Sequence, residues 1–259
     1  MEFRDFALAV VTSDVLDVKL APPAGPLTDD HPGTPLRLEG PGRPDDLTIL
    51  PAPKVKVPSI DGMADPAQRP RILHALANHE LQAAELFAWA LLAFPDAPAE
   101  MRRGLRKILD DEQRHTRMYV ARLKASGGRL GDHPVSGYFW RKAEHLHTPL
   151  HFVCAMSLTF ENANLDHTVD YAAAARRAGD EKTALVIERV GRDEEDHVRF
   201  GWRWLRELGG DRDPWDVYRE HLTWPLRPAK ARGKRFHPEG RRRAGLDEGF
   251  IRRLEASTE

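Results

Sequence analysis

The sequence predicts an all-α protein whose core is a four-helix bundle. Four long segments between residues 67 and 210 place apolar side chains at helical spacing. Short loops join the first two segments and the last two, while a much longer connection separates the pairs. The pattern Asp-Glu-x-x-His also occurs twice, at residues 111–115 and 193–197. We therefore expect two antiparallel helix hairpins joined by a crossover.

The composition is that of a globular protein with one or two domains. The chain has 259 residues, of which 41% are hydrophobic and 31% charged, with a formal net charge of -1. This near-neutral balance gives no global reason to expect binding to nucleic acid or membranes. The start of the chain lacks the basic and apolar regions of a signal peptide, and the single Cys154 is consistent with a reducing compartment. We expect a cytoplasmic protein.

Residues 1–66 are expected to form a short helix followed by a proline-rich arm. Phe3, Phe6, Ala7 and Val10 have helical spacing, which predicts an amphipathic helix over residues 3–12. Twelve prolines then recur between residues 21 and 70, a density that excludes regular helix. A disordered linker is one interpretation of this region. Its eight Leu, Ile and Val residues between 36 and 60 favour an extended arm wrapped over the core.

The helices of the bundle are bounded by proline and glycine. We expect the first two over residues 71–94 and 98–125, because Pro95 ends one and Gly127-Gly128 stops the other. A crossover follows at residues 127–146. The last two helices are expected over the ranges 148–178 and 181–208.

This connectivity is that of a ferritin-like four-helix bundle. It assigns residues 67–210 to the bundle and residues 211–259 to a C-terminal tail. Within the tail we expect short helices near residues 215–222 and 247–254.

Each Asp-Glu-x-x-His pattern can supply two ligands to one metal ion. Glu and His three residues apart lie on one helix face, a turn apart. Dinuclear carboxylate bundles use two such motifs, together with one glutamate from each of the other two helices. Glu80 and Glu161 meet that need, because each lies among apolar residues where a lone carboxylate would be costly to bury.

The spacing of these glutamates repeats between the two halves of the chain. Glu112 follows Glu80 by 32 residues, and Glu194 follows Glu161 by 33. A single Glu-x-x-His is more often a solvated helix face, but two copies with matching buried glutamates favour a two-metal site. Carboxylates with one imidazole per ion suit iron first and manganese next, with zinc a lesser possibility. The six predicted ligands are Glu80, Glu112, His115, Glu161, Glu194 and His197.

Four further residues are candidates near this site. Asp111 and Asp193 precede the ligating glutamates and could each orient the histidine of the opposite hairpin, or lie on the surface. Tyr119 shares a face with Glu112 and could donate an electron or a hydrogen bond, although core packing is the favoured alternative. Asn164, one turn after Glu161, is the candidate polar group of a substrate pocket.

Residues 227–243 contain eight Lys or Arg and one Glu. Such a segment can attract a phosphate backbone. It can equally lie over acidic helix surface such as residues 193–196, or be solvated. Because Phe236 is its one aromatic residue, nucleic acid is not the favoured partner.

Several segments spread along the chain carry a resemblance to a known family. They are residues 78–85, 130–132 with Trp140, Glu161 with 164–166, 193–204 and 238–246. In these segments the chain resembles an uncharacterised bacterial family of ferritin-like proteins. It departs from that family's usual residues at Asn78, where histidine is frequent, and at Ala163-Asn164, where Arg-Gly is frequent. The resemblance implies a ferritin-like fold and a di-metal site, but no known reaction.

Together these patterns favour a dinuclear iron or manganese protein that acts as an O₂-dependent oxidase or hydroxylase. Such an enzyme would need a small-molecule substrate and an electron donor, and would be a monomer or dimer. The alternative is a metal-binding or iron-storage protein without turnover. A tRNA-modifying hydroxylase is a lesser alternative, which rests on the basic segment 227–243.

Overall fold

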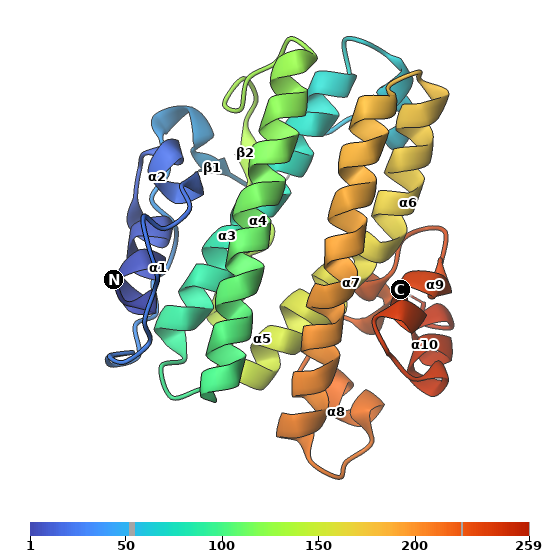
Figure 1. The fold of residues 1–259 in the computed structure, drawn as a ribbon. Coiled ribbons are helices and arrows are strands. Elements are labelled where there is room, and N and C mark those ends of the chain that lie inside the picture. The colour runs from blue at the N-terminus through green and yellow to red at the C-terminus, as the bar shows by residue number, and fades with distance from the viewer. Residues whose placement is uncertain (52–54, 224, 259) are drawn as a thin grey trace. The chain divides into compact units, whose positions relative to one another are not determined.

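The structure is a computed structural model that describes residues 1–51, 55–223 and 225–258. Its long elements are all α-helices, which confirms the predicted all-α class (Figure 1). The chain divides into two compact units, residues 1–144 and residues 145–259. Among the described residues, no helix is long and apolar enough to cross a membrane. The three-part division at residues 66 and 210 stays a prediction.

The first unit is built on a helix hairpin. Helix α3 (Arg69–Ala93) and helix α4 (Ala99–Ala125) run side by side and are joined by a short loop, residues 94–98, that contains Pro95 (Figure 1). From Leu81 to its end, α3 is buried on all faces. Such burial requires neighbours on both sides of a helix. Helix α4 covers one side of α3, and α1 (Phe3–Thr12) packs on another. The predicted helices at 3–12, 71–94 and 98–125 are therefore confirmed.

The proline-rich region follows the helices of the first unit. The Leu36 amide donates a hydrogen bond to the Leu92 carbonyl at 3.0 Å, and the Trp89 indole donates to the Leu38 carbonyl at 3.0 Å. These contacts replace the regular hydrogen bonds that proline prevents. The described part of this region lies along α3 as the predicted arm would, and residues 52–54 of the arm lie outside the described residues.

Short elements complete the first unit. Helix α2 (Leu16–Leu20) precedes the proline-rich arm, and the 3₁₀ turns η1 (Asp45–Leu47) and η3 (Ile60–Ala64) interrupt it. The 3₁₀ helix η4 (Trp140–His145) ends the crossover. Strand β1 (Ile49–Leu50) pairs in parallel with β2 (Val135–Ser136), with Ile49 opposite Val135. This pairing joins the arm to the crossover.

A buried carboxylate of α3 binds side chains of the N-terminal region and of the crossover. Glu85 forms an ion pair with Lys19 at 3.0 Å, and both side chains are fully buried. Arg43 donates to both Glu85 carboxylate oxygens at 2.7 Å, and the Trp140 indole donates to one of them at 2.8 Å. Burial lowers the pKa of Lys19, while the Glu85 carboxylate opposes that change. The arm and the crossover are therefore attached to α3 through one charge.

His74 makes the folding of the first unit depend on pH. Its Nε2 accepts a hydrogen bond from the Gly131 amide at 3.0 Å, which requires the neutral ring. Burial, with a smaller contribution from neighbouring His133, lowers the pKa of His74 from 6.5 to about 4. Protonation therefore favours the unfolded chain, so this stabilisation is present above pH 6.5 and is lost as the pH falls toward 4.

We expect His74 to make the free energy of unfolding fall by about 2 kcal/mol between pH 7 and pH 5. Other groups titrate in the same range, so the test compares wild-type protein with His74→Gln by chemical denaturation at both pH values. The variant should lose about 2 kcal/mol less than wild type over this interval. An equal loss in both proteins would contradict the assignment to His74.

The second unit is also built on a helix hairpin, but the first helical segment of this hairpin is irregular. Helix α5 (Pro149–Ala155) leads into a π-helical turn, η5 (Met156–Glu161), and then into α6 (Asn162–Arg177). Helix α7 (Glu181–Gly209) returns alongside (Figure 1). The predicted helix over residues 148–178 is therefore present, with a π-helical turn in its middle that was not expected, and the helix over 181–208 is confirmed.

The π-helical turn lies against a close approach of α7. A Cβ atom added at Gly201 would stand 2.4 Å from the Ser157 Cβ, which no ordinary contact allows. The Thr159 hydroxyl donates to the Cys154 carbonyl, five residues earlier, at 2.7 Å. The π-helical turn is thus stabilised by a side-chain hydrogen bond of its own, and it fits against α7 because Gly201 has no side chain.

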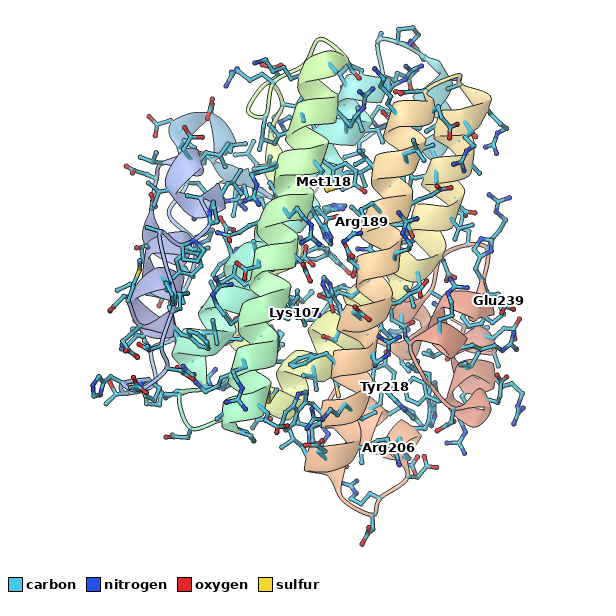
Figure 2. The ribbon with its side chains drawn as sticks, viewed as in Figure 1. Lys107, Met118, Arg189, Arg206, Tyr218 and Glu239 are labelled. Atoms are coloured by element: carbon cyan, nitrogen blue, oxygen red, sulfur yellow. The ribbon has the colours of Figure 1, made fainter. Side chains whose placement is uncertain are left out.

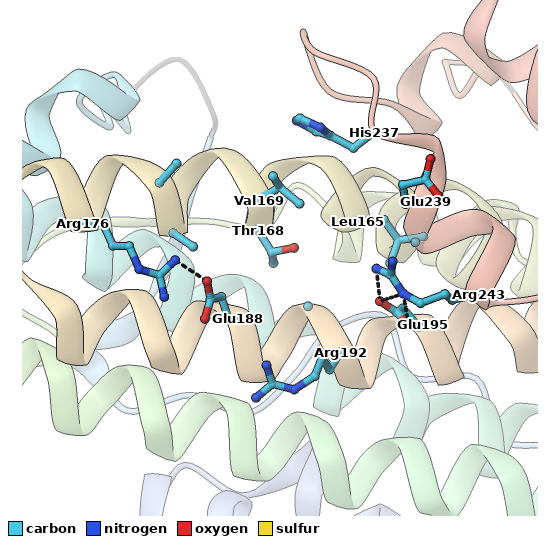
Figure 3. A pocket seen from close by; sticks show the side chains of 14 residues that line it. Leu165, Thr168, Val169, Arg176, Glu188, Arg192, Glu195, His237, Glu239 and Arg243 are labelled. Atoms are coloured by element: carbon cyan, nitrogen blue, oxygen red, sulfur yellow. Dashed lines mark hydrogen bonds and ion pairs between the residues drawn. The ribbon is translucent and has the colours of Figure 1, made fainter.

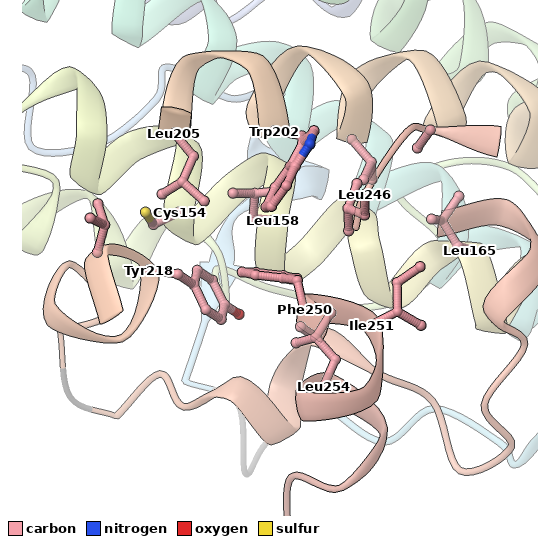
Figure 4. Packing of buried hydrophobic residues seen from close by; sticks show 14 residues of the cluster. Cys154, Leu158, Leu165, Trp202, Leu205, Tyr218, Leu246, Phe250, Ile251 and Leu254 are labelled. Atoms are coloured by element: carbon pink, nitrogen blue, oxygen red, sulfur yellow. The ribbon is translucent and has the colours of Figure 1, made fainter. Parts of the chain in front are cut away.

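The C-terminal segment, residues 211–258, packs onto the hairpin of the second unit. It contains α8 (Pro214–Glu220), η6 (Pro228–Ala231), α9 (Pro238–Arg243) and α10 (Glu248–Glu255). The predicted helices near residues 215–222 and 247–254 are confirmed, while α9 lies in the basic segment and was not expected. Figure 4 shows how Tyr218, Phe250 and Leu254 of this segment meet Trp202 and Leu158 in one hydrophobic cluster, the C-terminal core.

Candidate metal site

The first unit gathers three predicted ligands in one cluster. Glu80 comes from α3, and Glu112 and His115 come from one face of α4. His115 Nδ1 lies 3.5 Å from a Glu80 carboxylate oxygen and 3.6 Å from a Glu112 oxygen. All three side chains are buried. They offer ligand atoms within 4.8 Å of one another, so the first cluster could hold a metal ion.

The second unit repeats this arrangement. Glu161 comes from the end of the π-helical turn, and Glu194 and His197 come from one face of α7. His197 Nδ1 lies 3.7 Å from a Glu161 oxygen and 3.4 Å from a Glu194 oxygen. These side chains are also buried, and their ligand atoms lie within 4.8 Å of one another. The second cluster therefore has the same donors and the same ring nitrogen as the first.

The distances in each cluster suit two ligands of one ion. All four nitrogen-to-oxygen separations fall between 3.4 and 3.7 Å, longer than a good hydrogen bond. Two donors that each lie about 2.1 Å from a metal ion are about 3.0–3.4 Å apart in tetrahedral or octahedral geometry. If the histidine nitrogen and the carboxylate oxygens moved slightly closer together around a cation, each would lie at an ordinary coordination distance from it.

The charge of each cluster also fits a cation. Two carboxylates outnumber one imidazole, so the ionised cluster remains negative even when its histidine is protonated. Burying that net charge is costly unless a positive ion balances it. Oxygen donors with a single nitrogen donor are typical of iron and manganese sites.

The four other predicted site residues differ in what they contact. The Asn164 side-chain amide donates to a Glu194 oxygen at 3.0 Å, so it contacts a predicted ligand directly. Tyr119 is buried on α4. Asp111 pairs with Arg114 at 2.7 Å, and Asp193 is hydrogen-bonded to an arginine of its own helix at 3.0 Å. The orienting role of either aspartate toward an opposite histidine stays a prediction.

A groove of about 450 Å³ lies between α6, α7 and α9 of the second unit (Figure 3). Its floor is apolar, with Leu165 and Val169. Ion pairs stand at its two ends, Arg176 with Glu188 and Arg243 with Glu195. None of the predicted ligands lines this groove, and neither does Asn164.

The basic segment is partly used within the fold. Arg243 pairs with Glu195 of α7 at 2.6 Å, and Arg235 pairs with Asp170 of α6 at 2.6 Å. Arg241 is fully buried and pairs with Asp166 at 2.7 Å. Arg243 and Arg235 therefore neutralise acidic helix surface, the second of the interpretations that the sequence left open, whereas Arg241 pairs with Asp166 inside the fold.

Three important buried charges were missed by the sequence interpretation. Glu85 lies in the apolar run of α3, and the argument applied to Glu80 would have singled it out. Asp166 and Arg241 are 75 residues apart, and no local pattern connects them. The sequence signal for Glu85 was present, whereas that for the buried ion pair was not.

Comparison with known proteins gives a family but no function. Residues 12–252 match the sequence profile of a family described as "Protein of unknown function (DUF455)". No curated protein and no solved structure matched the chain. The expectation of an uncharacterised family is confirmed over nearly the whole chain.

Proposed function

We propose that this chain, which belongs to the DUF455 family of unknown function, is a dinuclear iron or manganese protein that uses O₂ as an oxidase or hydroxylase. The proposal rests on the two clusters. The repeated Glu, Glu, His cluster is the observation that supports this proposal most strongly. In the proposed arrangement the four helices form a ferritin-like bundle, and both clusters contribute to one two-metal site.

The internal repetition of the chain supports joining the clusters. Separations of 32 and 33 residues relate the two glutamates of each cluster, so both hairpins present their ligands at a similar distance from the turn. One Glu-x-x-His per hairpin and one further glutamate per hairpin is the ligand set of carboxylate two-metal bundles. Glu112 and Glu194 would then bridge or chelate, with Glu80 and Glu161 as terminal ligands.

A redox-active metal pair would supply the oxygen chemistry. Hydroxylation of a substrate places one oxygen atom in a C–H bond and reduces the other to water, so an external donor must provide two electrons and two protons. The chain's own residues would hold and orient the metal ligands and keep bulk water out. Burial of all six ligands serves that last purpose.

Two polar residues have proposed roles beside the ligands. Asn164 would fix the orientation of the Glu194 carboxylate through its 3.0 Å hydrogen bond. Its place in a substrate pocket stays a prediction. Tyr119 is buried on the same helix face as Glu112 and is proposed as a hydrogen-bond partner or an electron donor at the site.

Oxygen consumption by the iron-loaded protein tests the proposed reaction. Protein loaded anaerobically with Fe(II) is mixed with O₂, and oxygen uptake and loss of Fe(II) are followed together. We expect bound iron to react faster than free iron at the same concentration, and the Glu161→Ala variant to react more slowly than wild type. Bound iron that oxidises no faster than free iron would favour the metal-binding protein without turnover.

A further inference from the structure

The second cluster depends on an irregular stretch of backbone. Glu161 is the last residue of the π-helical turn, and Asn164 lies in the first turn of α6 that follows. A π-helical turn has poorer packing and hydrogen bonding than an α-helix, so it persists where its surroundings fix it. The direction of the Glu161 side chain therefore depends on what holds residues 156–161.

Tyr218 of α8 holds the turn from one side. Its hydroxyl forms a 2.8 Å hydrogen bond with the Thr159 hydroxyl, two residues before Glu161. Tyr218 is fully buried, and its ring packs against Phe250 in the C-terminal core (Figure 4). Figure 2 shows Tyr218 near the base of α7 in the same unit. A buried tyrosine hydroxyl needs such a partner, so this contact is specific rather than incidental.

Arg241 of α9 holds the residues just after the turn. Its guanidinium donates to the Asn162 carbonyl at 3.0 Å and to both carboxylate oxygens of Asp166 at 2.7 and 3.0 Å. Asp166 also accepts hydrogen bonds from the backbone amides of Gly233 and His237. A bidentate pair with added backbone donors gives a defined geometry as well as attraction.

Close backbone approaches leave little room for the turn to move. A Cβ atom at Gly233 would stand 2.9 Å from the Asp166 Cβ, and one at Gly201 would stand 2.4 Å from the Ser157 Cβ. The C-terminal segment therefore meets one side of this stretch while α7 meets another. Such contacts transmit a displacement of the segment to the turn.

We infer that the C-terminal segment positions the metal ligands of the second cluster, with Tyr218 and Arg241 as positioning residues for Glu161 and Asn164. This inference rests on the proposed function, because it assumes that the second cluster binds metal. It gives the C-terminal segment a role in the site although none of its residues is a predicted ligand. Residues that orient metal ligands typically change metal affinity by about 10- to 100-fold when altered.

The Tyr218→Phe variant tests this inference with the smallest structural change. It keeps the ring in the C-terminal core and removes the hydroxyl that contacts Thr159. We expect Co(II) to bind the second cluster about tenfold more weakly than in wild type, with a shifted visible spectrum from altered ligand geometry. Tyr171→Phe on α6 is the matched control and should leave the dissociation constant and spectrum unchanged.

Arg241→Lys tests the second contact and retains the positive charge. A lysine ammonium cannot engage both Asp166 oxygens and the Asn162 carbonyl in the geometry of the guanidinium fork. The exposed neighbour Arg242, changed to lysine, is its control. If Arg241→Lys fails to fold, Tyr218→Phe alone decides the question.

The possible failures are distinguishable. Wild-type protein that binds no Co(II), iron or manganese overturns the proposed function, and the inference with it. Wild-type protein that binds Co(II), with Tyr218→Phe showing the same dissociation constant and the same spectrum, overturns the inference alone.

Discussion

Replacing His197 with alanine is expected to lower the metal content from about two ions per chain to about one. The second cluster has one imidazole, and without it Glu161 and Glu194 remain as two buried carboxylates with no nitrogen donor between them. Metal content is measured by elemental analysis after expression with added iron or manganese. His115→Ala, the equivalent change in the first cluster, should have the same effect.

The control for this experiment is Asp196→Asn. Asp196 is adjacent to His197 but exposed, and it pairs with Arg199 on the surface of α7. It should retain the wild-type metal content because it belongs to neither cluster. A His197→Ala protein that binds as much metal as wild type would contradict the assignment of His197 as a ligand.

Glu85→Gln is expected to destabilise the fold by about 3–5 kcal/mol. The amide cannot balance the charge of Lys19, which is fully buried, or of Arg43, which is 4% exposed. One partner of a buried charge network would be lost while the other charges stay buried. Chemical denaturation of both proteins at neutral pH measures the difference.

Glu39→Gln is the matched control for Glu85→Gln. Glu39 lies in the proline-rich arm but is exposed, so its replacement should change the free energy of unfolding by less than about 0.5 kcal/mol. If Glu85→Gln also costs less than about 1 kcal/mol, the carboxylate is not the anchor of the N-terminal region.

Local patterns were sufficient to predict the long helices. Apolar periodicity and the proline and glycine residues at the ends located α1, α3, α4 and α7 within a few residues. The run from Phe152 to Phe160 was different, because it is apolar except for Ser157 and Thr159 and so has no polar face that would distinguish an α-helix from a π-helical turn. Close packing of Gly201 of α7 against Ser157 accompanies the turn, and that is a tertiary contact.

The candidate metal ligands were easier to predict than the contacts that hold them in place. Glu80 and Glu161 are conspicuous as carboxylates among apolar residues, and Glu-x-x-His has a recognisable spacing. Each half of the predicted ligand set is gathered in one cluster of one unit. The pairing of Asp166 with Arg241 could not be predicted, because it joins α6 to a segment that resembles a solvated basic tail.

The metal content of the wild-type protein tests the central claim most directly. Protein purified after iron or manganese supplementation, and freed of loosely bound ions, is analysed for metal and for protein concentration. The proposed site predicts about two ions of iron or manganese per chain. Less than about one ion per chain under both supplements would contradict a dinuclear site built from these two clusters.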